Sequence, residues 1–276
     1  VHVLDPFGVT GIPSSAFNPL HHLDPDDIDV AEEAATLADA LVFDAPGEAG
    51  EAHWNEEAKA LLAGLILFAA VHETEDRRTL ASVREYLTLP PDRFRALLGL
   101  MQESTGAGGL IARAANRFGG KADREAAGVL SSAQRHTHFL DSPRMTAVLG
   151  RSNFRFADLK RRNVSVFLVL PPDRLSTYSR WLRLMVTRSL SDMARAPSPV
   201  PAGAQTAPAL PVEPVLYLLD EFAALGRLEA VERAMGLMAG YGIQLWPILQ
   251  DLSQLRALYG TRANTFVANA GVLLTR

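Results

Sequence analysis

The sequence predicts an α/β fold in which a parallel sheet is interrupted by a long helical segment. Strand-like residues open the chain at 1–7, and helical patterns then continue to about residue 150. A buried-strand pattern returns at residue 164, and apolar strands alternate with helices after residue 214. Apolar strands separated by helices are typical of a parallel sheet with both faces covered. We therefore expect a sheet domain that carries a helical insertion.

Each expected element has its own local signal. Apolar residues at helical spacing predict most helices, and Pro91 occupies a favoured first-turn position. We expect strands at 1–7, 164–171, 215–222, 243–250 and 271–276. We expect helices at 29–42, 54–73, 79–89, 91–104, 109–118, 123–140, 177–196, 228–242 and 253–260. Six prolines between residues 197 and 214 predict a linker or a loop insertion there.

Composition and charge narrow the function classes. The apolar run 61–71 is too short to cross a bilayer and predicts a buried helix. The chain has no cysteine, which excludes disulfides and thiolate metal sites. Residues 1–58 contain no Lys or Arg, so an acidic first segment precedes a basic remainder. Contacts to phosphate backbones are therefore expected later in the chain, although the acidic stretch is equally consistent with a solvated face.

The strand at 215–219 runs directly into two carboxylates, Asp220 and Glu221. Ligand sites of parallel sheets lie beyond the carboxyl ends of the strands, and Gln250 follows a second such strand. A carboxylate there suits Mg²⁺, a second one orients an attacking water, and the amide senses a γ-phosphate. The alternative interpretation is structural, with the Asp-Glu pair capping and opening a helix.

A nucleoside triphosphatase of this kind also needs a glycine-rich loop with a lysine. The chain has three lysines, Lys59, Lys121 and Lys160. Lys121 follows two glycines, but Ala115 and Ala122 replace the first glycine and the Ser or Thr of the phosphate-loop pattern. We interpret this stretch as a turn between helices. We expect the phosphate loop to lie upstream of Val1, in a longer protein of which this chain is a fragment.

Several motifs together resemble the VirD4/TraG family, the coupling ATPases of type IV secretion and bacterial conjugation. They are "VLDPFGVTG" followed by "FNPL", "LLDEFAALGRLE", "MAGYGIQL", "ILQDLSQL", "LYG" and "ANAGVLLT". The similarity is tight at 210–276, clear at 1–20 and loose in the helical middle.

The resemblance implies a partial RecA-like parallel-sheet nucleotide-binding domain with an inserted all-α domain. The RecA-like domain would begin with residues 1–13 and continue at 151–276, with the all-α domain at 14–150 between them. Asp220 would be the Walker B acid and Mg²⁺ ligand, Glu221 its catalytic neighbour and Gln250 the amide sensor. ATP and Mg²⁺ would be the cofactors of the full-length protein, and no other metal is expected.

The resemblance also implies a setting and partners. Family members are anchored in the bacterial inner membrane, face the cytoplasm and form hexamers around a channel. They deliver relaxase–DNA complexes or effector proteins to the secretion apparatus, and the all-α domain is thought to meet this cargo. The fragment itself would be a soluble, cytoplasmic piece without the membrane anchor.

Some expected features depart from the family or have simpler interpretations. The arginine that some relatives place after Walker B is absent, which leaves Arg227, Arg233, Arg256 and Arg262 as alternatives, each also explicable as a solvated arginine. The histidine pairs His21-His22 and His136-x-His138 lack the spacing of metal ligands. Trp54 and Trp181 lie beside His or Arg, and we favour core positions over base stacking for both.

Three function classes remain. The first is an ATP-driven motor for DNA or protein secretion. The second is a cargo-binding all-α module without ATPase activity, and the third is a metal-assisted hydrolase that uses Asp220 and Glu221 alone. The third is weakest because no further ligand set accompanies the pair, and the residues upstream of Val1 would discriminate between the first two.

We expect the isolated chain neither to bind Mg-ATP tightly nor to hydrolyse it, since it contains no loop and lysine that neutralise the phosphates. Isothermal titration of the 276-residue chain with Mg-ATP tests this. Micromolar binding would mean that the phosphate site lies within the chain after all.

Overall fold

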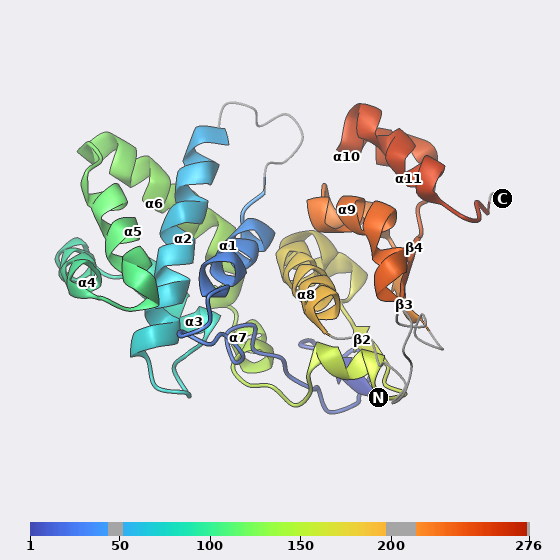
Figure 1. The fold of residues 1–276 in the computed structure, drawn as a ribbon, viewed down its shortest axis with the longest axis horizontal. Coiled ribbons are helices and arrows are strands. Elements are labelled where there is room, and N and C mark those ends of the chain that lie inside the picture. Colours follow the sequence, from blue (N-terminus) through green and yellow to red (C-terminus); the bar gives the residue numbers. More distant parts are fainter. Residues whose placement is uncertain (44–51, 197–213, 275–276) are drawn as a thin grey trace, which may run out of the picture. The chain divides into compact units, whose positions relative to one another are not determined.

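The computed structural model describes residues 1–43, 52–196 and 214–274 (Figure 1). The predicted linker at 197–214 therefore lies outside the described residues, apart from its last proline. The contacts divide the chain into two compact units. The larger unit contains residues 2–154 and 166–184, and the smaller contains Val1, 155–165 and 185–276.

Helices make up most of the larger unit. They are α1 (Val30–Leu41), α2 (Ala52–His72), α3 (Leu80–Leu87), α4 (Pro91–Glu103), α5 (Leu110–Gly119), α6 (Asp123–Thr137) and α7 (Pro143–Leu149). Short 3-10 turns lie at η2 (Ala107–Gly109), η3 (His138–Asp141) and η5 (Pro172–Arg174). The prediction of helices was too broad at its start, because the described residues 14–29 form turns and extended backbone. The sequence patterns also missed α7.

Helix α2 forms the centre of the larger unit. It packs against α1, α3, α5 and α6, and it buries apolar side chains around most of its circumference. The predicted burial of the apolar run 61–71 is confirmed. Two glycines permit close approach: a methyl group on Gly64 would lie 2.3 Å from the Ala114 Cβ, and one on Gly128 would lie 2.8 Å from the Trp54 ring. Larger side chains would force these helices apart.

A buried polar cluster links α2 to α6. The Asn55 Oδ1 accepts hydrogen bonds from the Ser132 Oγ at 2.7 Å and from the His136 Nε2 at 2.9 Å. Burial, together with the charges of Arg180 and other nearby cations, lowers the pKa of His136 to about 3. His136 is therefore neutral at physiological pH, and it has a core role rather than a metal-binding one.

A small parallel sheet and the segment after it join the two ends of the helical region. Strand β1 (His2–Leu4) pairs with β2 (Val166–Leu168), with His2 opposite Val166. Phe17 then donates its backbone N–H to the Val148 carbonyl at 2.8 Å. The two ends of the helical segment therefore lie close together. The predicted domain boundaries at 13/14 and 150/151 differ from the edges of the compact units and stay a prediction.

The loop after β1 is organised by a buried carboxylate. Asp5, 3% exposed, accepts hydrogen bonds from the backbone N–H groups of Val9 and Thr10 and from the Thr10 hydroxyl. Burial raises the pKa of Asp5, but these hydrogen bonds outweigh it and hold the pKa below its usual range. The motif "DPFGVTG" is therefore a rigid turn whose conformation depends on one ionised side chain.

The smaller unit contains a second parallel pair of strands. Strand β3 (Val215–Leu219) pairs with β4 (Ile243–Pro247). The unit's helices precede, separate and follow these strands in sequence. They are the second half of α8 (Leu175–Arg195), α9 (Glu229–Leu237), α10 (Leu252–Tyr259) and α11 (Ala263–Asn269), with 3-10 turns η4 (Phe156–Lys160), η6 (Phe222–Leu225), η7 (Met238–Tyr241) and η8 (Gly260–Arg262). The sequence patterns missed α11.

Two expectations for the sheet are wrong within the described residues. Residues 271–274 form no strand, because no neighbouring strand pairs with them there. The β3–β4 pair is covered on one face only: Leu218 is 58% exposed and Trp246 is 53% exposed on the other. Trp181 of α8, by contrast, is fully buried, which confirms its core position.

Glu57 of α2 generates a stability prediction. Its carboxylate lies 2.5 Å from Arg117 and 2.8 Å from Lys121, and the Arg117 hydrogen bond is the largest cause that lowers the pKa of Glu57 to about 2. The free energy gained is present above the ordinary pKa of about 4.5 and is lost as pH falls towards 2. Glu57→Gln should destabilise the protein by about 1–2 kcal/mol at pH 7, discounted for the exposure of Arg117.

Urea unfolding at pH 7 and pH 3 measures this effect, and the difference from wild type should shrink at the lower pH. Glu103→Gln is the matched control, because Glu103 is exposed and has no described partner. Equal effects of the two substitutions would contradict the stabilising role of Glu57.

Candidate functional site at the end of β3

The end of β3 is held by buried residues on both sides of the Asp-Glu pair. Leu219 before the pair is 8% exposed, and Phe222 after it is fully buried. The Phe222 ring packs among Tyr259 and Phe266, at centroid distances of 6.2 and 5.8 Å. Because Leu219 and Phe222 are anchored in the core, the dipeptide between them must form a short exposed loop. Asp220 and Glu221 are both exposed.

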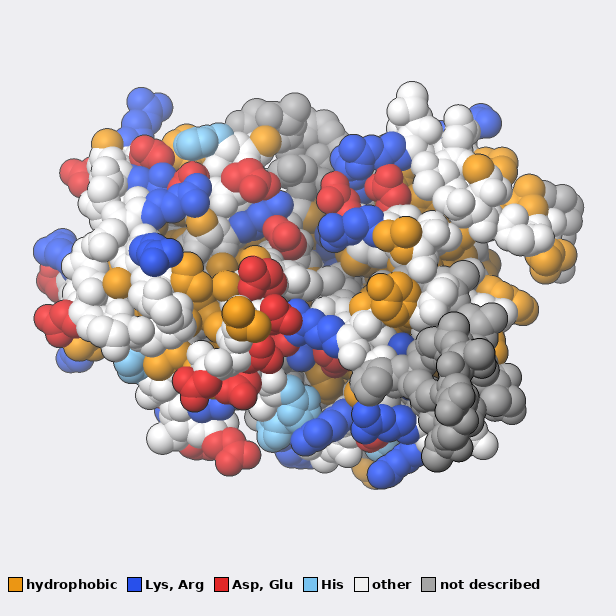
Figure 2. Space-filling view, viewed as in Figure 1, with side chains coloured by type: hydrophobic (Ala, Val, Ile, Leu, Met, Phe, Trp, Pro, Cys, Tyr) orange, Lys and Arg blue, Asp and Glu red, His pale blue; other side chains and the backbone are white. Residues whose placement is uncertain are grey.

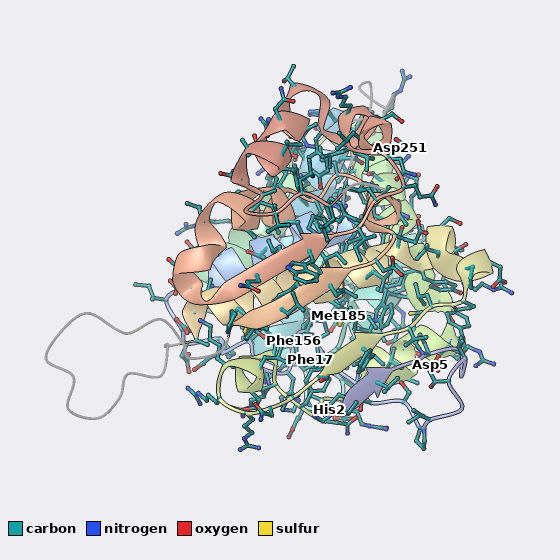
Figure 3. The ribbon with its side chains drawn as sticks, turned by 90° about the vertical axis from the view of Figure 1, so that its right-hand side faces the viewer. His2, Asp5, Phe17, Phe156, Met185 and Asp251 are labelled. Atoms are coloured by element: carbon teal, nitrogen blue, oxygen red, sulfur yellow. The ribbon has the colours of Figure 1, made fainter. Side chains whose placement is uncertain are left out.

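The pairing of the two strands continues past their ends. The Ile248 N–H donates to the Leu219 carbonyl at 2.9 Å, and the Phe222 N–H donates to the Ile248 carbonyl at 3.0 Å. These bonds bring the segment after β4 alongside the Asp-Glu loop. Figure 3, in which the strands β3 and β4 face the viewer, labels Asp251 beyond the end of β4.

Glu221 adopts a backbone conformation that favours glycine. Its φ is +48°, in the left-handed region, and the Asp220 Oδ1 accepts the Glu221 N–H at 3.0 Å. Glu221 precedes the turn η6, but its side chain makes no capping hydrogen bond. The structural alternative for this pair, helix capping, therefore lacks its defining contact. A strained non-glycine residue at a strand end is typical of functional sites.

Gln250 lies across from Glu221. Its Nε2 is 3.4 Å from the Glu221 Oε2 and 3.5 Å from the Oε1, and both side chains are exposed. Its backbone N–H donates to the Gln254 Oε1 at 3.2 Å, and Asp251 caps α10 by accepting the Gln254 N–H at 3.0 Å. The start of α10 thus fixes Gln250. The structure brings Asp220, Glu221 and Gln250 together at the carboxyl ends of β3 and β4, a site called the strand edge below. The chemical roles of the three residues stay predictions.

The donor set at this edge fits a hydrated divalent cation. It offers two exposed carboxylates and one amide oxygen, and Mg²⁺ takes oxygen ligands while keeping several waters. Asp220 would hold the ion, directly or through a bound water. Among the described residues, this site included, no group of three or more His, Asp or Glu side chains is arranged to bind a metal.

A second polar group lies behind β3 and was missed from the sequence. The Tyr217 hydroxyl is 2.5 Å from the Ser189 Oγ of α8, and burial raises the pKa of Tyr217. One turn along, Arg188 pairs with Asp192 at 3.0 Å, both largely buried. The i, i+4 spacing of Arg188 and Asp192 could have predicted this ion pair from the sequence. The burial of the pair could not be predicted, because it depends on the packing of α8.

The other sequence candidates have ordinary surroundings. Lys121 lies between α5 and α6 and pairs with Glu57 and Glu125, at 2.8 and 2.6 Å, so the interpretation as a turn is confirmed. Among the arginines, Arg227 pairs with Glu229 and Arg262 lies 3.6 Å from Glu232. Arg233 and Arg256 are exposed on α9 and α10.

The comparisons with solved structures show that the chain shares its fold with a plasmid coupling protein. The chain aligns with solved structures of the plasmid coupling protein TrwB, including its complex with ADP and Mg²⁺, at a TM-score of 0.71 and 17% identity over 97% of this chain and 57% of that one. The complex of TrwB with a non-hydrolysable ATP analogue aligns equally well, at 0.71.

The family follows from the sequence comparisons. The model for type IV secretory system conjugative DNA transfer matches residues 1–275, and the chain belongs to this family. It is 28% identical over 229 residues to the conjugal transfer protein TraG of Escherichia coli, covering 79% of this chain and 35% of TraG. It is 34% identical over 131 residues to VirD4 of Agrobacterium fabrum, covering 47% and 18%. The predicted VirD4/TraG resemblance is confirmed.

The chain thus spans about a third of the length of TraG. The α/β architecture with parallel strands and a large helical part agrees with the predicted fold class. None of the described helices is both long and apolar enough to traverse a bilayer.

The left-handed conformation of Glu221 yields a stability prediction. Glycine tolerates φ near +48° and alanine does not, so Glu221→Gly should be more stable than Glu221→Ala by about 1 kcal/mol. The opposite order is expected at Arg233, which is exposed on helix α9. There the alanine variant should be more stable than the glycine variant by about 1 kcal/mol. Denaturant unfolding of the four variants measures both differences. A preference for alanine at both positions would show that Glu221 is not left-handed.

Proposed function

We propose that this chain is part of a type IV secretion coupling ATPase. The full protein recruits relaxase–DNA complexes or effector proteins and uses ATP hydrolysis to deliver them to the secretion channel. One observation carries the ATPase assignment: Asp220 and the left-handed Glu221 stand exposed at a parallel strand end, with Gln250 at 3.4 Å from the Glu221 carboxylate. The ADP–Mg²⁺ complex of TrwB supports the cofactors.

In this proposal each residue at the strand edge has a separate task. Asp220 holds Mg²⁺, which when bound neutralises phosphate charge and orients the ATP. Glu221 accepts a hydrogen bond from the attacking water and aligns it. The Gln250 amide has an NH₂ donor group and an acceptor oxygen. It can therefore contact Glu221 and at the same time sense whether the γ-phosphate of the nucleotide is present. The phosphates themselves need a loop outside these 276 residues, since Lys121 is engaged with Glu57 and Glu125.

The partners follow from the family and from charge. Membership of the conjugative DNA transfer family supports DNA and type IV secretion components as partners. From the VirD4/TraG resemblance we also propose that the full protein is a hexamer at the cytoplasmic face of the inner membrane. The all-α domain is the proposed receptor for relaxase or effector cargo. Its acidic beginning disfavours naked DNA and suits partners with basic patches.

A cargo-binding module without ATPase activity is the alternative for the fragment. The observation that favours it is the large extent of the helical part. The polar cluster at Asn55 and the ion pairs at Glu57 join helices of this part to one another and do not involve the strand edge. Such a module would bind cargo with or without nucleotide. The two proposals are compatible, because one concerns the full protein and the other this piece of it.

The decisive experiment uses the full-length protein. Glu221→Gln should leave ATP binding within about threefold of wild type and lower turnover by about 10²-fold or more, since water alignment is lost while the metal ligand stays. Asp220→Ala should weaken both binding and turnover. Nucleotide titration and steady-state phosphate release measure the two quantities.

Glu229→Gln serves as the control, because Glu229 is an exposed carboxylate on α9 that pairs with Arg227 rather than with the strand edge. Turnover of Glu221→Gln equal to wild type would remove Glu221 from the mechanism. Absence of turnover in the wild-type protein would favour the module.

A further inference from the structure

A short basic turn in the smaller unit is not used by the strand-edge site. It comprises Arg155, Arg161 and Arg162, three exposed arginines that flank the 3-10 turn η4. None of the three guanidinium groups forms a hydrogen bond or ion pair with another described residue. Asp158 is the single carboxylate between residues 155 and 165, and it forms no ion pair within the described part of the chain.

The backbone of this turn is firmly held. Phe156 is 3% exposed, and the buried Lys160 donates its Nζ to the Ala196 carbonyl at 3.0 Å. The backbone N–H groups of Arg161 and Arg162 both donate to the Asp158 carbonyl, at 3.0 and 2.9 Å. Three like charges on an anchored turn repel one another, so their arrangement favours an anionic partner. Arginine forks match phosphate oxygens in particular.

An exposed aromatic ring lies beside this turn. Tyr241 of η7 is 46% exposed, and the Lys160 Nζ lies 6.0 Å from its ring centroid. Lys160 therefore connects the basic turn to Tyr241 within the same unit. Guanidinium groups with a neighbouring exposed aromatic ring are typical of surfaces that bind single strands, where phosphates meet the cations and an unpaired base stacks on the ring.

We propose that the basic turn and Tyr241 bind single-stranded DNA, with the guanidinium groups on backbone phosphates and the tyrosine ring against a base. Figure 2 shows Lys and Arg side chains at the middle and right of the lower edge of the view, where Figure 1 draws the yellow-green segment that contains the basic turn. This inference deepens the proposed function, of which DNA is one cargo. It is measured without nucleotide, so a failure of ATP turnover would leave it intact.

The experiment is fluorescence anisotropy of a labelled thirty-nucleotide oligo-dT with the 276-residue chain at several salt concentrations. The triple variant Arg155→Gln, Arg161→Gln, Arg162→Gln should bind at least about tenfold more weakly at low salt. Its log–log salt dependence should be shallower by about two, since each phosphate contact to a single strand contributes about 0.7. The corresponding triple Arg→Lys variant keeps the charges and should retain most of the affinity.

Two controls distinguish binding at this surface from non-specific electrostatic attraction to DNA. The triple variant Arg93→Gln, Arg113→Gln, Arg124→Gln removes the same charge from exposed, unpaired arginines of the helical unit and should bind like wild type. Tyr241→Ala should lower the affinity for oligo-dT about tenfold, and Tyr241→Leu should lower it nearly as much. Tyr241→Phe keeps the ring and should bind oligo-dT with the wild-type affinity. Binding of a thirty-base-pair duplex should not respond to Tyr241.

Several outcomes overturn the proposal. These are absence of oligo-dT binding by the wild-type chain, equal loss in the two triple Gln variants, and tighter binding of duplex than of single strands. Tighter binding of oligo-U than of oligo-dT would assign the surface to RNA instead. Circular dichroism of each variant confirms that the fold is retained, and the triple Arg→Lys variant tests the surface independently if a Gln variant is unfolded.

Discussion

The burial of Leu219 and Phe222 on either side of two carboxylates is the constraint on which the candidate site depends. Both flanking side chains are held in the core, and backbone hydrogen bonds to Ile248 continue the strand pairing across the loop. The two residues between them must therefore turn outwards within a very short span. The left-handed backbone of Glu221 is the result, and its strain is balanced by the packing of Phe222 against Tyr259 and Phe266.

The same constraint relates the site to the rest of the smaller unit. Helix α8 supports β3 from behind through Ser189 and Tyr217, so the strand that carries Asp220 is tied to a long helix by a buried polar contact. On the other side, Asp251 caps α10 and positions Gln250. A strand edge held by two helices in this way is pre-organised, and its exposed carboxylates need little rearrangement to hold a cation. The basic turn is anchored separately, by Phe156 and Lys160, so the proposed DNA surface and the proposed nucleotide site lie on different elements.

Helix positions were largely predictable from local patterns, because the apolar spacing of 54–73 and the proline at 91 act over a few residues. The strands at 215–219 and 243–247 were predictable for the same reason. Helices α7 and α11 were missed because their seven-residue lengths give little periodic signal. The strand expected at 271–276 failed in its described part, since an apolar run becomes a strand only where another backbone pairs with it.

By itself, the sequence determined the family, the adjacency of Asp220 and Glu221 and the lack of a phosphate loop among these residues, because motifs and spacing are properties of the chain. Only the tertiary structure decided that Gln250 meets Glu221, that His136 and Trp181 are core residues, and that one face of β3–β4 is exposed. It also decided which arginines form ion pairs: Arg117 pairs with Glu57, whereas Arg155, Arg161 and Arg162 have no partner among the described residues. The physical reason is that burial and pairing depend on residues far apart in the sequence, which meet only when the core packs.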